Sequence, residues 1–429
     1  MKILVVGGGG REHALVWKFL QDDPSCEIIV APGNAGIAQI ARCLPIAATD
    51  IPGLLTLARE EKVDLTMVGP EAPLAAGIAD EFRAAGLAIF GPTRSAARIE
   101  TSKRFAKELM LAHGIPTAAA SFHESLDSAK AAVREVGAPV VIKASGLAGG
   151  KGVVVAQSME EADKAIESML GDRVFDQAGS EILVEEFMSG EELSIFVITD
   201  GEGFVTLPAA QDHKRLLDGD TGPNTGGMGA YSPVSLATPA LISEIEKTII
   251  APTLKAMRAA GSPFTGLLYA GIMLTPAGPK VVEFNCRFGD PETETILPRM
   301  RSALLPLVNA VARGESVAGY GDIECKPVSA VTLILAAGGY PGKPRLGDAV
   351  QFTAPPQGMH VFHAGTSIAS DTGEFITAGG RVIALTCVAP TLPQAVVRAR
   401  EYAERIHFAG KQFRRDIGHR ELGRIARAT

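Results

Sequence analysis

Three side chains of one segment could bind a metal ion and a phosphoryl group. The segment KVVEFNCRFGDPE is expected to form a strand, and the two-residue spacing of Glu283, Asn285 and Arg287 places them on one face of it. A carboxylate and an amide supply the hard oxygen ligands that Mg²⁺ accepts, with waters and substrate phosphates completing its shell. The arginine can then hold the phosphoryl group during transfer. A pattern as short as E-x-N also arises by chance, so it needs support from other segments.

A glycine-rich stretch at residues 143–152, KASGLAGGKG, lies between two predicted strands. It is not a Walker loop, because Ser145 stands where that loop needs glycine and Gly152 stands where it needs serine or threonine. A hairpin of this kind can instead fold over a triphosphate as a lid, with backbone N–H groups and the Lys143 charge holding the phosphates. Standing alone, the stretch would be interpreted as an ordinary mobile hairpin.

Four acidic residues flank a glycine break in the segment ILVEEFMSGEELSIF, which is expected to form a strand, a short linker and a second strand. The linker could hold the edge of an adenine through backbone groups and the ribose hydroxyls through a carboxylate. We favour Glu192 over Glu191 for the ribose, although the sequence does not decide between them. At least one of the four acids is expected to be a solvated surface charge.

The first glycine run, in VVGGGGREHA, follows a strand and opens a helix, so residues 7–10 can bring backbone N–H groups to an anion. A dinucleotide oxidoreductase is one interpretation. The fingerprint G-x-G-x-x-G fails, however, because its third glycine falls on Glu12 or His13, and the second strand ends in APGN, where a ribose-binding acid is expected. Arg11 in the turn favours a compact sugar phosphate. Alternatively, the glycines only permit close packing of strand and helix.

The elements that must position these groups fall into three predicted domains. Residues 1–101 alternate apolar runs ending in Gly or Pro with amphipathic segments, which predicts a doubly wound parallel α/β sheet. Residues 102–313 combine helices and strand pairs around the second glycine run, with a lid subdomain at about 121–190. Residues 314–429 are expected to form a β-rich α+β domain that ends in a helix. The predicted fold class is therefore multidomain, with α/β and α+β parts.

Composition limits the class of protein. The chain of 429 residues is 46% hydrophobic and 21% charged, which fits a globular protein and excludes disorder. The formal net charge of −7 offers no global positive field, so we expect no nucleic-acid partner. The five scattered cysteines indicate neither a disulfide framework nor a zinc site, and the cytoplasm is the expected compartment. No signal peptide or membrane segment is expected.

Taken in chain order, these features resemble the ATP-grasp superfamily: Lys103, the strand–lid–strand with Lys143, the EEFMSGEE linker and the E-x-N-x-R strand. Within it, the chain is most similar to the phosphoribosylamine–glycine ligase family, also called glycinamide ribonucleotide synthetases. The segments that carry this similarity span the chain: GGGGREHAL, PGNAG, GPEAPL, LPAAQDHKRLLDGDTGPNTGGMGAYSP, EFNCRFGDPET, VFHAGT and RRDIG. The resemblance implies a pre-ATP-grasp N-terminal domain, a central ATP-grasp fold with a mobile lid, and a C-terminal domain.

The resemblance implies a ligase that uses ATP to join glycine to 5-phosphoribosylamine, the second step of de novo purine biosynthesis. The carboxylate of glycine would become a glycyl phosphate before the amine attacks, and glycinamide ribonucleotide, ADP and phosphate would leave. Mg²⁺ or Mn²⁺ would be the cofactor, and the lid would exclude water from the acyl phosphate. The implied partners are these small molecules alone, with the protein a monomer or weak dimer.

The resemblance also assigns site residues by their places in the motifs. The implied catalytic residues are Arg287, Lys143 and Asp212, and the metal ligands are Glu283 and Asn285. The implied ATP-binding residues are Lys103, Lys143, Ser145, Gly149, Gly150, Lys151, Gly152, Glu185, Glu186, Phe187 and Glu192. The implied substrate-binding residues are Gly8, Gly9, Gly10, Arg11, Gly33, Asn34, Glu71, Asp212, His213, Lys214, Gly226, Gly227 and Arg287.

One departure from the superfamily concerns the metal. Many members carry a further acid on the strand before the E-x-N strand, whereas GLLYAGIML has none between Gly266 and Leu274. The number of metal ions is therefore open, with Glu292 either a helper or simply an acid at a helix N-terminus. Another ATP-grasp carboxylate–amine ligase is the alternative function, and it would lack QDHKR and GPNTGGMG. A non-catalytic nucleotide-binding protein would have lost metal ligands or phosphate lysines, and none is missing here.

Overall fold

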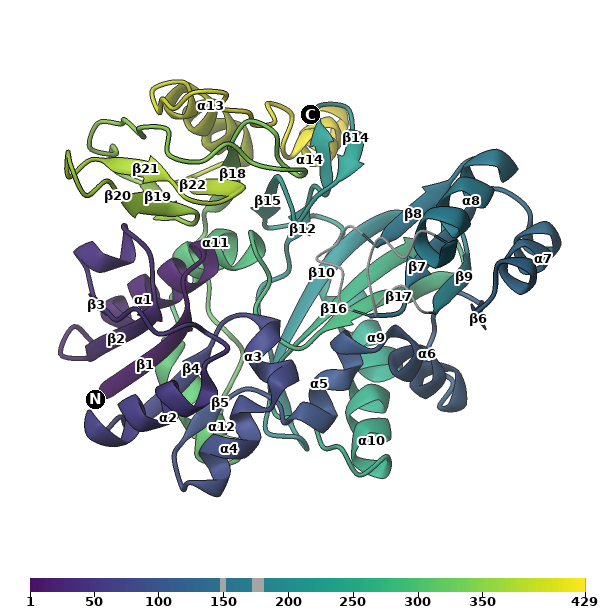
Figure 1. The fold of residues 1–429 in the computed structure, drawn as a ribbon, viewed down its shortest axis with the longest axis horizontal. Helices are drawn as coiled ribbons and strands as arrows, with labels where there is room; N and C mark the ends of the chain where they lie inside the picture. The colour runs from purple at the N-terminus through teal and green to yellow at the C-terminus, as the bar shows by residue number, and fades with distance from the viewer. Residues whose placement is uncertain (147–151, 172–180, 429) are drawn as a thin grey trace.

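The computed structural model describes residues 1–146, 152–171 and 181–428 (Figure 1). Gly149, Gly150 and Lys151, three of the expected ATP-binding residues, lie outside the described residues. In the view of Figure 1, the N-terminal part lies at the lower left, the C-terminal part lies above it, and a smaller sheet lies at the right. Among the described residues, no helix is long and apolar enough to cross a membrane.

The N-terminal part is a five-stranded parallel sheet in the order β3-β2-β1-β4-β5, covered on both faces. Alternate residues of its central strand enter two different cores: Ile3 and Val5 pack with α1, while Leu4 and Val6 pack with α2 and α4. Burial on both faces explains the unbroken apolar run. The predicted doubly wound parallel sheet is confirmed. Its elements are β1 (Lys2–Gly7), α1 (Gly10–Asp22), β2 (Glu27–Pro32), β3 (Arg42–Cys43), α2 (Ile51–Glu60), β4 (Leu65–Val68), α3 (Glu71–Ala76), α4 (Ile78–Ala84), β5 (Ile89–Phe90) and α5 (Arg94–Thr101).

An antiparallel sheet in the order β11-β10-β16-β17 lies at the centre of the molecule (Figure 1). Its strand β10 is also buried on both faces, with Leu193 and Ile195 packed against α10, and Phe196 and Ile198 packed against α12. Packing on both faces therefore holds this sheet rigidly, together with the side chains at the ends of its strands. The elements are α6 (Lys103–Ala112), β10 (Glu191–Thr199), β11 (Phe204–Thr206), α9 (Pro239–Ile245), a π-helical turn (Glu246–Ile250), α10 (Ala251–Ala259), β16 (Gly266–Thr275), β17 (Gly278–Asn285), α11 (Glu292–Ile296), a 3-10 turn (Leu297–Arg299) and α12 (Leu305–Ala312).

A second antiparallel sheet, in the order β6-β9-β7-β8, projects at the right of Figure 1 and has its own small core. The strands that flank the second glycine run pair antiparallel, with Lys143 opposite Val153, so the hairpin prediction is confirmed. The linker at residues 187–190 joins this sheet to β10. The elements are β6 (Ala120–His123), α7 (Leu126–Val136), β7 (Val140–Ala144), β8 (Val153–Ala156), α8 (Met159–Ile166), a π-helical turn (Glu167–Gly171) and β9 (Ile182–Glu186).

The C-terminal sheet has the order β12-β15-β18-β22-β19 and takes two strands from the middle of the chain. Strands β12 and β15 come from residues 207–233, and Ala230 of β15 pairs with Thr332 of β18. The sequence did not predict this pairing. The elements are β12 (Gln211–Asp212), β13 (Arg215–Leu217), β14 (Thr221–Asn224), β15 (Gly229–Ser232), β18 (Ser329–Ala336), β19 (Met359–His363), β20 (Thr366–Ile368), β21 (Phe375–Thr377), β22 (Arg381–Ala389), α13 (Leu392–Ala403) and α14 (His419–Ala428).

Helix α1 packs directly on strand β19, which joins the N-terminal and C-terminal parts. The His13 ring nitrogen Nδ1 accepts a hydrogen bond from the backbone N–H of His363 at 2.9 Å. Trp17 packs edge-on against His360, with ring centroids 4.9 Å apart. Burial lowers the pKa of His13 to about 3 and the pKa of His363 to about 4, so both imidazoles are neutral at physiological pH.

The neutral His13 and His363 make stability depend on pH. Their folded-state pKa values lie below the ordinary value near 6.5, so the unfolded chain binds protons first as the pH falls. Stability is therefore full above about pH 6.5 and falls by about 1.4 kcal/mol per pH unit for each histidine down to about pH 4. Urea unfolding at several pH values measures this loss, which we expect to be smaller for His13→Asn and unchanged for a variant of the exposed His113. A wild-type slope equal to that of His13→Asn would contradict the prediction.

Candidate functional site

Glu283 and Asn285, the predicted metal ligands, lie on the same face of β17. On the neighbouring strand β16, Gly271 pairs with Glu283 and Tyr269 pairs with Asn285. A Cβ atom at Gly271 would lie 3.2 Å from the Glu192 carboxylate and 3.7 Å from the Glu283 side chain. The absence of a side chain at Gly271 thus lets the Glu192 and Glu283 side chains approach this point of the sheet. Carboxylate and amide oxygens brought together in this way are donors that a divalent cation accepts, with waters completing its shell.

The side chains around Glu283 and Asn285 would give a metal ion few further protein ligands. In the part of the chain that the structure describes, no three His, Cys, Asp or Glu side chains form a metal-binding group. The Tyr269 hydroxyl donates to Glu292 at 2.7 Å, so that carboxylate already has a partner. A metal at Glu283 and Asn285 would therefore take its other ligands from phosphate oxygens and water, as Mg²⁺ commonly does.

Positive charge surrounds Glu283. The ammonium of Lys214 lies 3.7 Å from its carboxylate. Burial alone would raise the pKa of Glu283, yet the charges around it lower that pKa instead. The contributing cations, in order of effect, are Lys214, Lys143, Lys103 and Arg287. The carboxylate is consequently held ionised, as a metal ligand must be, and the surrounding cations suit a bound polyphosphate.

Lys103 and Lys107 of helix α6 and Lys143 of strand β7 make buried or partly buried polar contacts. Lys143 Nζ lies 2.6 Å from one oxygen of Glu185, and Lys107 Nζ lies 3.1 Å from the other. Lys103 Nζ donates to the Gly146 carbonyl at 3.1 Å. Burial would raise the pKa of Glu185, but the two lysines that flank it lower it. Sequence reasoning missed Lys107, although its spacing of four from Lys103 places both on one helix face and could have found it.

Replacing Glu185 with glutamine will destabilise the protein by about 3 to 5 kcal/mol, because Lys107 and Lys143 lose their common buried counter-charge. Urea unfolding followed by circular dichroism measures the change. Glu186→Gln is the matched control, since that neighbouring side chain is 51% exposed and lies 3.8 Å from Lys280. We expect the control to change stability by less than about 0.5 kcal/mol. Equal effects of the two substitutions would refute the role of the buried pairs.

Glu191 and Glu192 open β10 and point to opposite faces of it. The Glu192 carboxylate accepts a hydrogen bond from Lys214 and lies against Gly271. The two oxygens of Glu191 instead accept from Arg424 of α14 at 2.9 and 3.0 Å. Glu192 therefore lies among the charged groups of the site, while Glu191 faces the C-terminal helix. The ribose contact of Glu192 stays a prediction.

Residues 211–214 alternate between two surroundings. Asp212 and Lys214 face the acids of the site. Burial, with the neighbouring carboxylates adding to it and Lys214 opposing it, raises the pKa of Asp212 well above its usual value. Gln211 faces the other way, and its Nε2 donates to the backbone carbonyl of Glu192 at 2.7 Å. Alternation along an extended segment accounts for this division.

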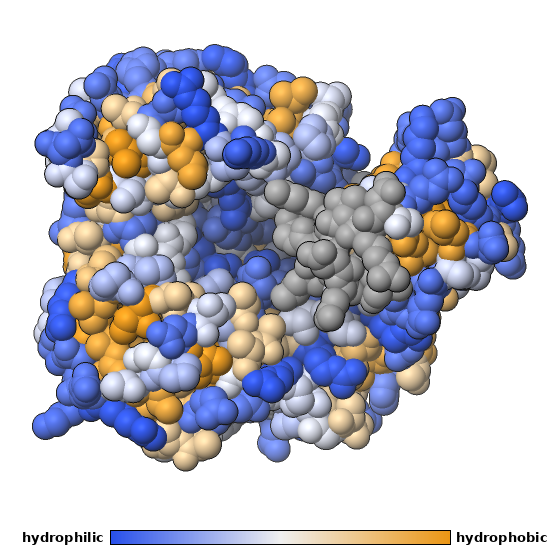
Figure 2. Space-filling model, viewed as in Figure 1, coloured by the Kyte–Doolittle hydropathy of each residue, from blue (hydrophilic) through white to orange (hydrophobic). Residues whose placement is uncertain are grey.

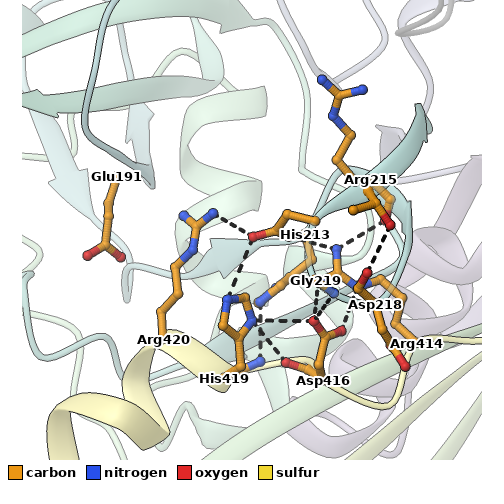
Figure 3. Close-up of polar contacts among 12 residues, drawn as sticks. Glu191, His213, Arg215, Asp218, Gly219, Arg414, Asp416, His419 and Arg420 are labelled. Atoms are coloured by element: carbon orange, nitrogen blue, oxygen red, sulfur yellow. Dashed lines mark hydrogen bonds and ion pairs between the residues drawn. The ribbon is translucent and has the colours of Figure 1, made fainter.

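His213 also faces away from Asp212 and Lys214, into the network of Figure 3. Its ring lies 5.6 Å from the ring of His419. Beside it, Arg414 forms ion pairs with Asp220 at 2.8 Å and with Asp416 at 2.7 Å. The network ties the loop after β12 to the segment before α14. A contact of His213 with substrate stays a prediction, and its observed neighbours belong to this network.

Arg287 is held by acceptors from three parts of the chain. Its Nε lies 3.2 Å from Glu71 at the start of α3, and a terminal nitrogen lies 3.3 Å from Glu100 of α5. The same guanidinium donates to Asn285 Oδ1 and to the Phe288 carbonyl, each at 3.2 Å. Its orientation is therefore fixed beside the predicted metal ligands. Sequence reasoning missed Glu100, because one acid in an amphipathic helix carries no distinguishing pattern.

The first glycine run reaches the same carbonyl. Arg11, at the start of α1, donates to the Phe288 carbonyl at 3.1 Å, so this oxygen accepts from both Arg11 and Arg287. Glu12 is buried beneath the run, and its carboxylate accepts from the backbone N–H of Gly9 at 2.5 Å. The strand-to-helix turn of residues 7–10 and the end of β17 therefore meet, although they are far apart in the chain.

The PGNAG loop touches the first glycine run. Asn34 Nδ2 donates to the Gly8 carbonyl at 2.9 Å. A Cβ atom at Gly8 would lie 2.3 Å from the Gly33 carbonyl, and one at Gly10 would lie 2.6 Å from Glu294 Oε1. A side chain at Gly8 or Gly10 would not fit unless these neighbours moved. The glycines therefore allow the segments to lie in close contact. Their contacts with a sugar phosphate stay a prediction.

The second substrate loop, at Gly226 and Gly227, lies between the turn after β17 and the C-terminal sheet. The Gly226 N–H donates to the Tyr340 hydroxyl at 3.0 Å, and its carbonyl accepts from Arg381 at 2.5 Å. A Cβ atom at Gly227 would lie 2.6 Å from the Pro291 ring, and this residue has φ of +110°. Both features require glycine. The position of the loop therefore depends on the C-terminal part, and its contact with substrate stays a prediction.

The first described end of the second glycine run lies against α6, and the other pairs with β7. The Ser145 carbonyl accepts from the backbone N–H of Lys103 at 3.0 Å, and the Gly152 carbonyl accepts from Ala144 at 2.8 Å. In the linker before β10, Phe187 is 37% exposed. The run thus starts beside Lys103, and its contact with phosphates stays a prediction.

Figure 2 shows a hollow with a hydrophilic floor between the N-terminal part below and the C-terminal part above. Two antiparallel sheets joined by a linker, with Lys143 on a strand of one and an E-x-N strand in the other, define an ATP-grasp protein. The chain belongs to the phosphoribosylglycinamide synthetase family. Residues 1–100 match the N domain of that family, residues 101–293 its ATP-grasp (A) domain and residues 330–420 its C domain.

Similar proteins cover the whole chain. The phosphoribosylamine–glycine ligase of Vibrio cholerae is 47% identical over 431 residues, which span 99% of each chain. That of Yersinia pestis is 49% identical over 430 residues, which span 99% of this chain and all of the relative. The crystal structure of phosphoribosylamine–glycine ligase from Thermotoga maritima, at 34% identity, covers 97% of this chain and 100% of its own with a TM-score of 0.85.

A more distant similarity concerns the fold alone. The biotin carboxylase domain of a 2-oxoglutarate carboxylase from Hydrogenobacter thermophilus aligns with a TM-score of 0.74 at 18% identity. That alignment covers 96% of this chain and 91% of the other. The predicted multidomain fold class, with its central ATP-grasp part, is confirmed.

Proposed function

We propose that this chain is an ATP-dependent phosphoribosylamine–glycine ligase. It joins glycine to 5-phosphoribosylamine through a glycyl phosphate and releases glycinamide ribonucleotide, ADP and phosphate, the second step of de novo purine biosynthesis. One observation carries this proposal: the Phe288 carbonyl accepts from both Arg287 and Arg11. The strand that would hold a transferring phosphoryl group therefore meets the loop that would hold a sugar phosphate.

The order of events follows from the charges. Lys103, Lys143 and Arg287 hold the phosphates while an oxygen of the glycine carboxylate attacks the γ-phosphorus, the bond from that phosphorus to the β–γ bridging oxygen breaks, and ADP is the leaving group. Positioning with charge neutralisation supplies most of the acceleration. The amine of 5-phosphoribosylamine then attacks the glycyl carbonyl, and phosphate leaves. In our assignment Asp212, which lies among the charged groups of the site, accepts the proton of the amine.

A divalent cation, Mg²⁺ or Mn²⁺, would be held by Glu283 and Asn285 and would neutralise charge on the phosphates. The support for it is the chemistry of the two donors and their place on one face of β17. We propose one protein-bound ion, since no three His, Cys, Asp or Glu side chains of the described residues form a metal-binding group.

No covalent intermediate on the protein is needed. Cys286 lies next to Arg287 but is buried, and burial together with Glu100 raises the pKa of its thiol well above the ordinary value. A thiol of this kind is a poor nucleophile. Direct attack of the glycine carboxylate on ATP is therefore the route we propose.

The alternative is another ATP-grasp carboxylate–amine ligase. The full-length similarity to phosphoribosylamine–glycine ligases does not favour it. We further propose a cytoplasmic enzyme that is a monomer or weak dimer and has only small-molecule substrates.

Coupled release of ADP tests the proposal. The purified chain with ATP and Mg²⁺ receives glycine, freshly generated 5-phosphoribosylamine, or both. We expect ADP formation at steady state only with both, and no turnover when alanine or serine replaces glycine. ADP formation that depends on neither substrate, or equal rates with another amino acid, would refute the assignment.

A further inference from the structure

The last residue of the linker, Gly190, and the first two residues of β10 are each held in place. A Cβ atom at Gly190 would lie 2.3 Å from the Leu274 carbonyl, so the chain passes there in close contact with β16. The next residue, Glu191, accepts from Arg424, and the backbone carbonyl of Glu192 accepts from Gln211 at 2.7 Å. The end of the linker is therefore fixed immediately before the side chain expected to contact the ribose.

Arg424 of α14 is the centre of the contact with Glu191. One terminal nitrogen donates to both Glu191 oxygens at 2.9 and 3.0 Å, and the other donates to Glu421 at 2.8 Å and to the Tyr231 hydroxyl at 3.1 Å. Its Nε donates to the Ser235 hydroxyl at 3.1 Å. The side chain is 18% exposed. A planar fork with all three nitrogens engaged is specific to arginine, and a lysine cannot reproduce it.

A second path runs from the same arginine to the backbone of β10. The Tyr231 hydroxyl, which accepts from Arg424, donates to Gln211 Oε1, and Gln211 Nε2 donates to the Glu192 carbonyl. Tyr231 and Gln211 are buried, so these hydrogen bonds are protected from water. The C-terminal helix therefore reaches the start of β10 through a side chain and through a backbone carbonyl.

We propose that Arg424 is a positioning residue for nucleotide binding. It holds Glu191 and, through Tyr231 and Gln211, the Glu192 backbone, which keeps the Glu192 carboxylate directed at the ribose end of the site. The inference rests on the proposed function in that the site binds a nucleotide whose ribose Glu192 contacts. It gives the C-terminal helix a part in binding ATP, although that helix contributes no group that contacts the nucleotide.

Calorimetric titration with MgADP tests this role without turnover. We expect Arg424→Ala to raise the Kd for MgADP about five- to tenfold, the effect of about one net hydrogen bond on the orientation of Glu192. Arg424→Lys should recover part of the affinity, because it keeps the charge near Glu191 but loses the fork. Arg427→Ala, one turn away on the exposed face of α14, is the matched control and should leave the Kd unchanged.

A double-mutant cycle separates positioning from a general structural effect. Because Arg424 also acts through Tyr231, Glu191→Gln should weaken binding by no more than Arg424→Ala, and the double variant should bind no more weakly than Arg424→Ala alone. The KM for glycine should change less than twofold in all of them. Additive losses, an equal rise in the KM for glycine, or an unchanged Kd in Arg424→Ala would overturn the inference. Absence of MgADP binding by the wild type would instead refute the proposed function.

If Arg424→Ala does not fold, as judged by circular dichroism, Arg424→Lys and Glu191→Gln carry the test. Both keep the size of the side chain they replace. An unchanged Kd in both would overturn the inference, and a raised Kd in both would support it.

Discussion

Replacing Glu283 with glutamine will abolish turnover while the fold remains intact. The substitution keeps the size of the side chain and removes the only charged ligand that β17 offers to a divalent cation, leaving the neutral Asn285. The carboxylate is held ionised because Lys214, 3.7 Å away, and the other site cations lower its pKa. Without it, those cations repel a divalent ion. We expect the rate of ADP release to fall at least about 100-fold, since even outer partners of a metal ligand cost 10- to 100-fold.

The measurement is ADP release at increasing Mg²⁺ and Mn²⁺, with circular dichroism to confirm folding. Glu244→Gln is the matched control, because this exposed side chain approaches the opposite end of the same hairpin, near Gly278. The control should retain normal activity. Near-normal turnover of Glu283→Gln at saturating metal would remove Glu283 from the metal site.

Arg287→Lys is expected to lose turnover about 100-fold although it keeps the positive charge. The guanidinium is oriented by Glu71, Glu100 and Asn285 at 3.2 to 3.3 Å, and a single ammonium cannot satisfy these acceptors while facing a phosphoryl group. Loss of one oriented donor at a transferring group typically costs 10²- to 10³-fold in kcat. We expect kcat and kcat/KM to fall equally, because the interaction is made in the transition state.

Steady-state kinetics with ATP as the varied substrate check this result. Arg301→Lys makes the same substitution at an exposed position and should have no effect. A rise in KM alone, with unchanged kcat, would show that Arg287 binds substrate and transition state equally. It would then have no special part in phosphoryl transfer.

The features that follow from sequence are those set within a short segment. A period of two places Glu283 and Asn285 on one face of β17, and the glycine run between two apolar runs predicts the β7–β8 hairpin beside Lys143. The parallel sheet of the N-terminal part follows in the same way from its apolar runs, each ending in Gly or Pro. These predictions depend on local periodicity and turn chemistry, and the structure agrees with them.

The partners contributed by distant segments could not be predicted. Lys107 and Glu100 lie on amphipathic helices, where a charged residue ordinarily faces solvent, and each is instead held by an opposite charge from another part of the chain. Strands β12 and β15 have two and four residues, too few for a periodic pattern, and their pairing is decided by the edge of the C-terminal sheet. The neighbours of His213 depend on that pairing, which is why its surroundings differ from those expected.

The contact between Glu191 and Arg424 has a consequence for synthesis of the chain, because 233 residues separate them. At roughly 5 to 20 residues per second, a ribosome needs about 10 to 50 s to add the residues between them. During that time β15 lacks β18, its partner in the C-terminal sheet, and the start of β10 lacks α14. Until α14 has been made, the start of β10 therefore lacks the contact that we propose positions Glu192 for nucleotide binding.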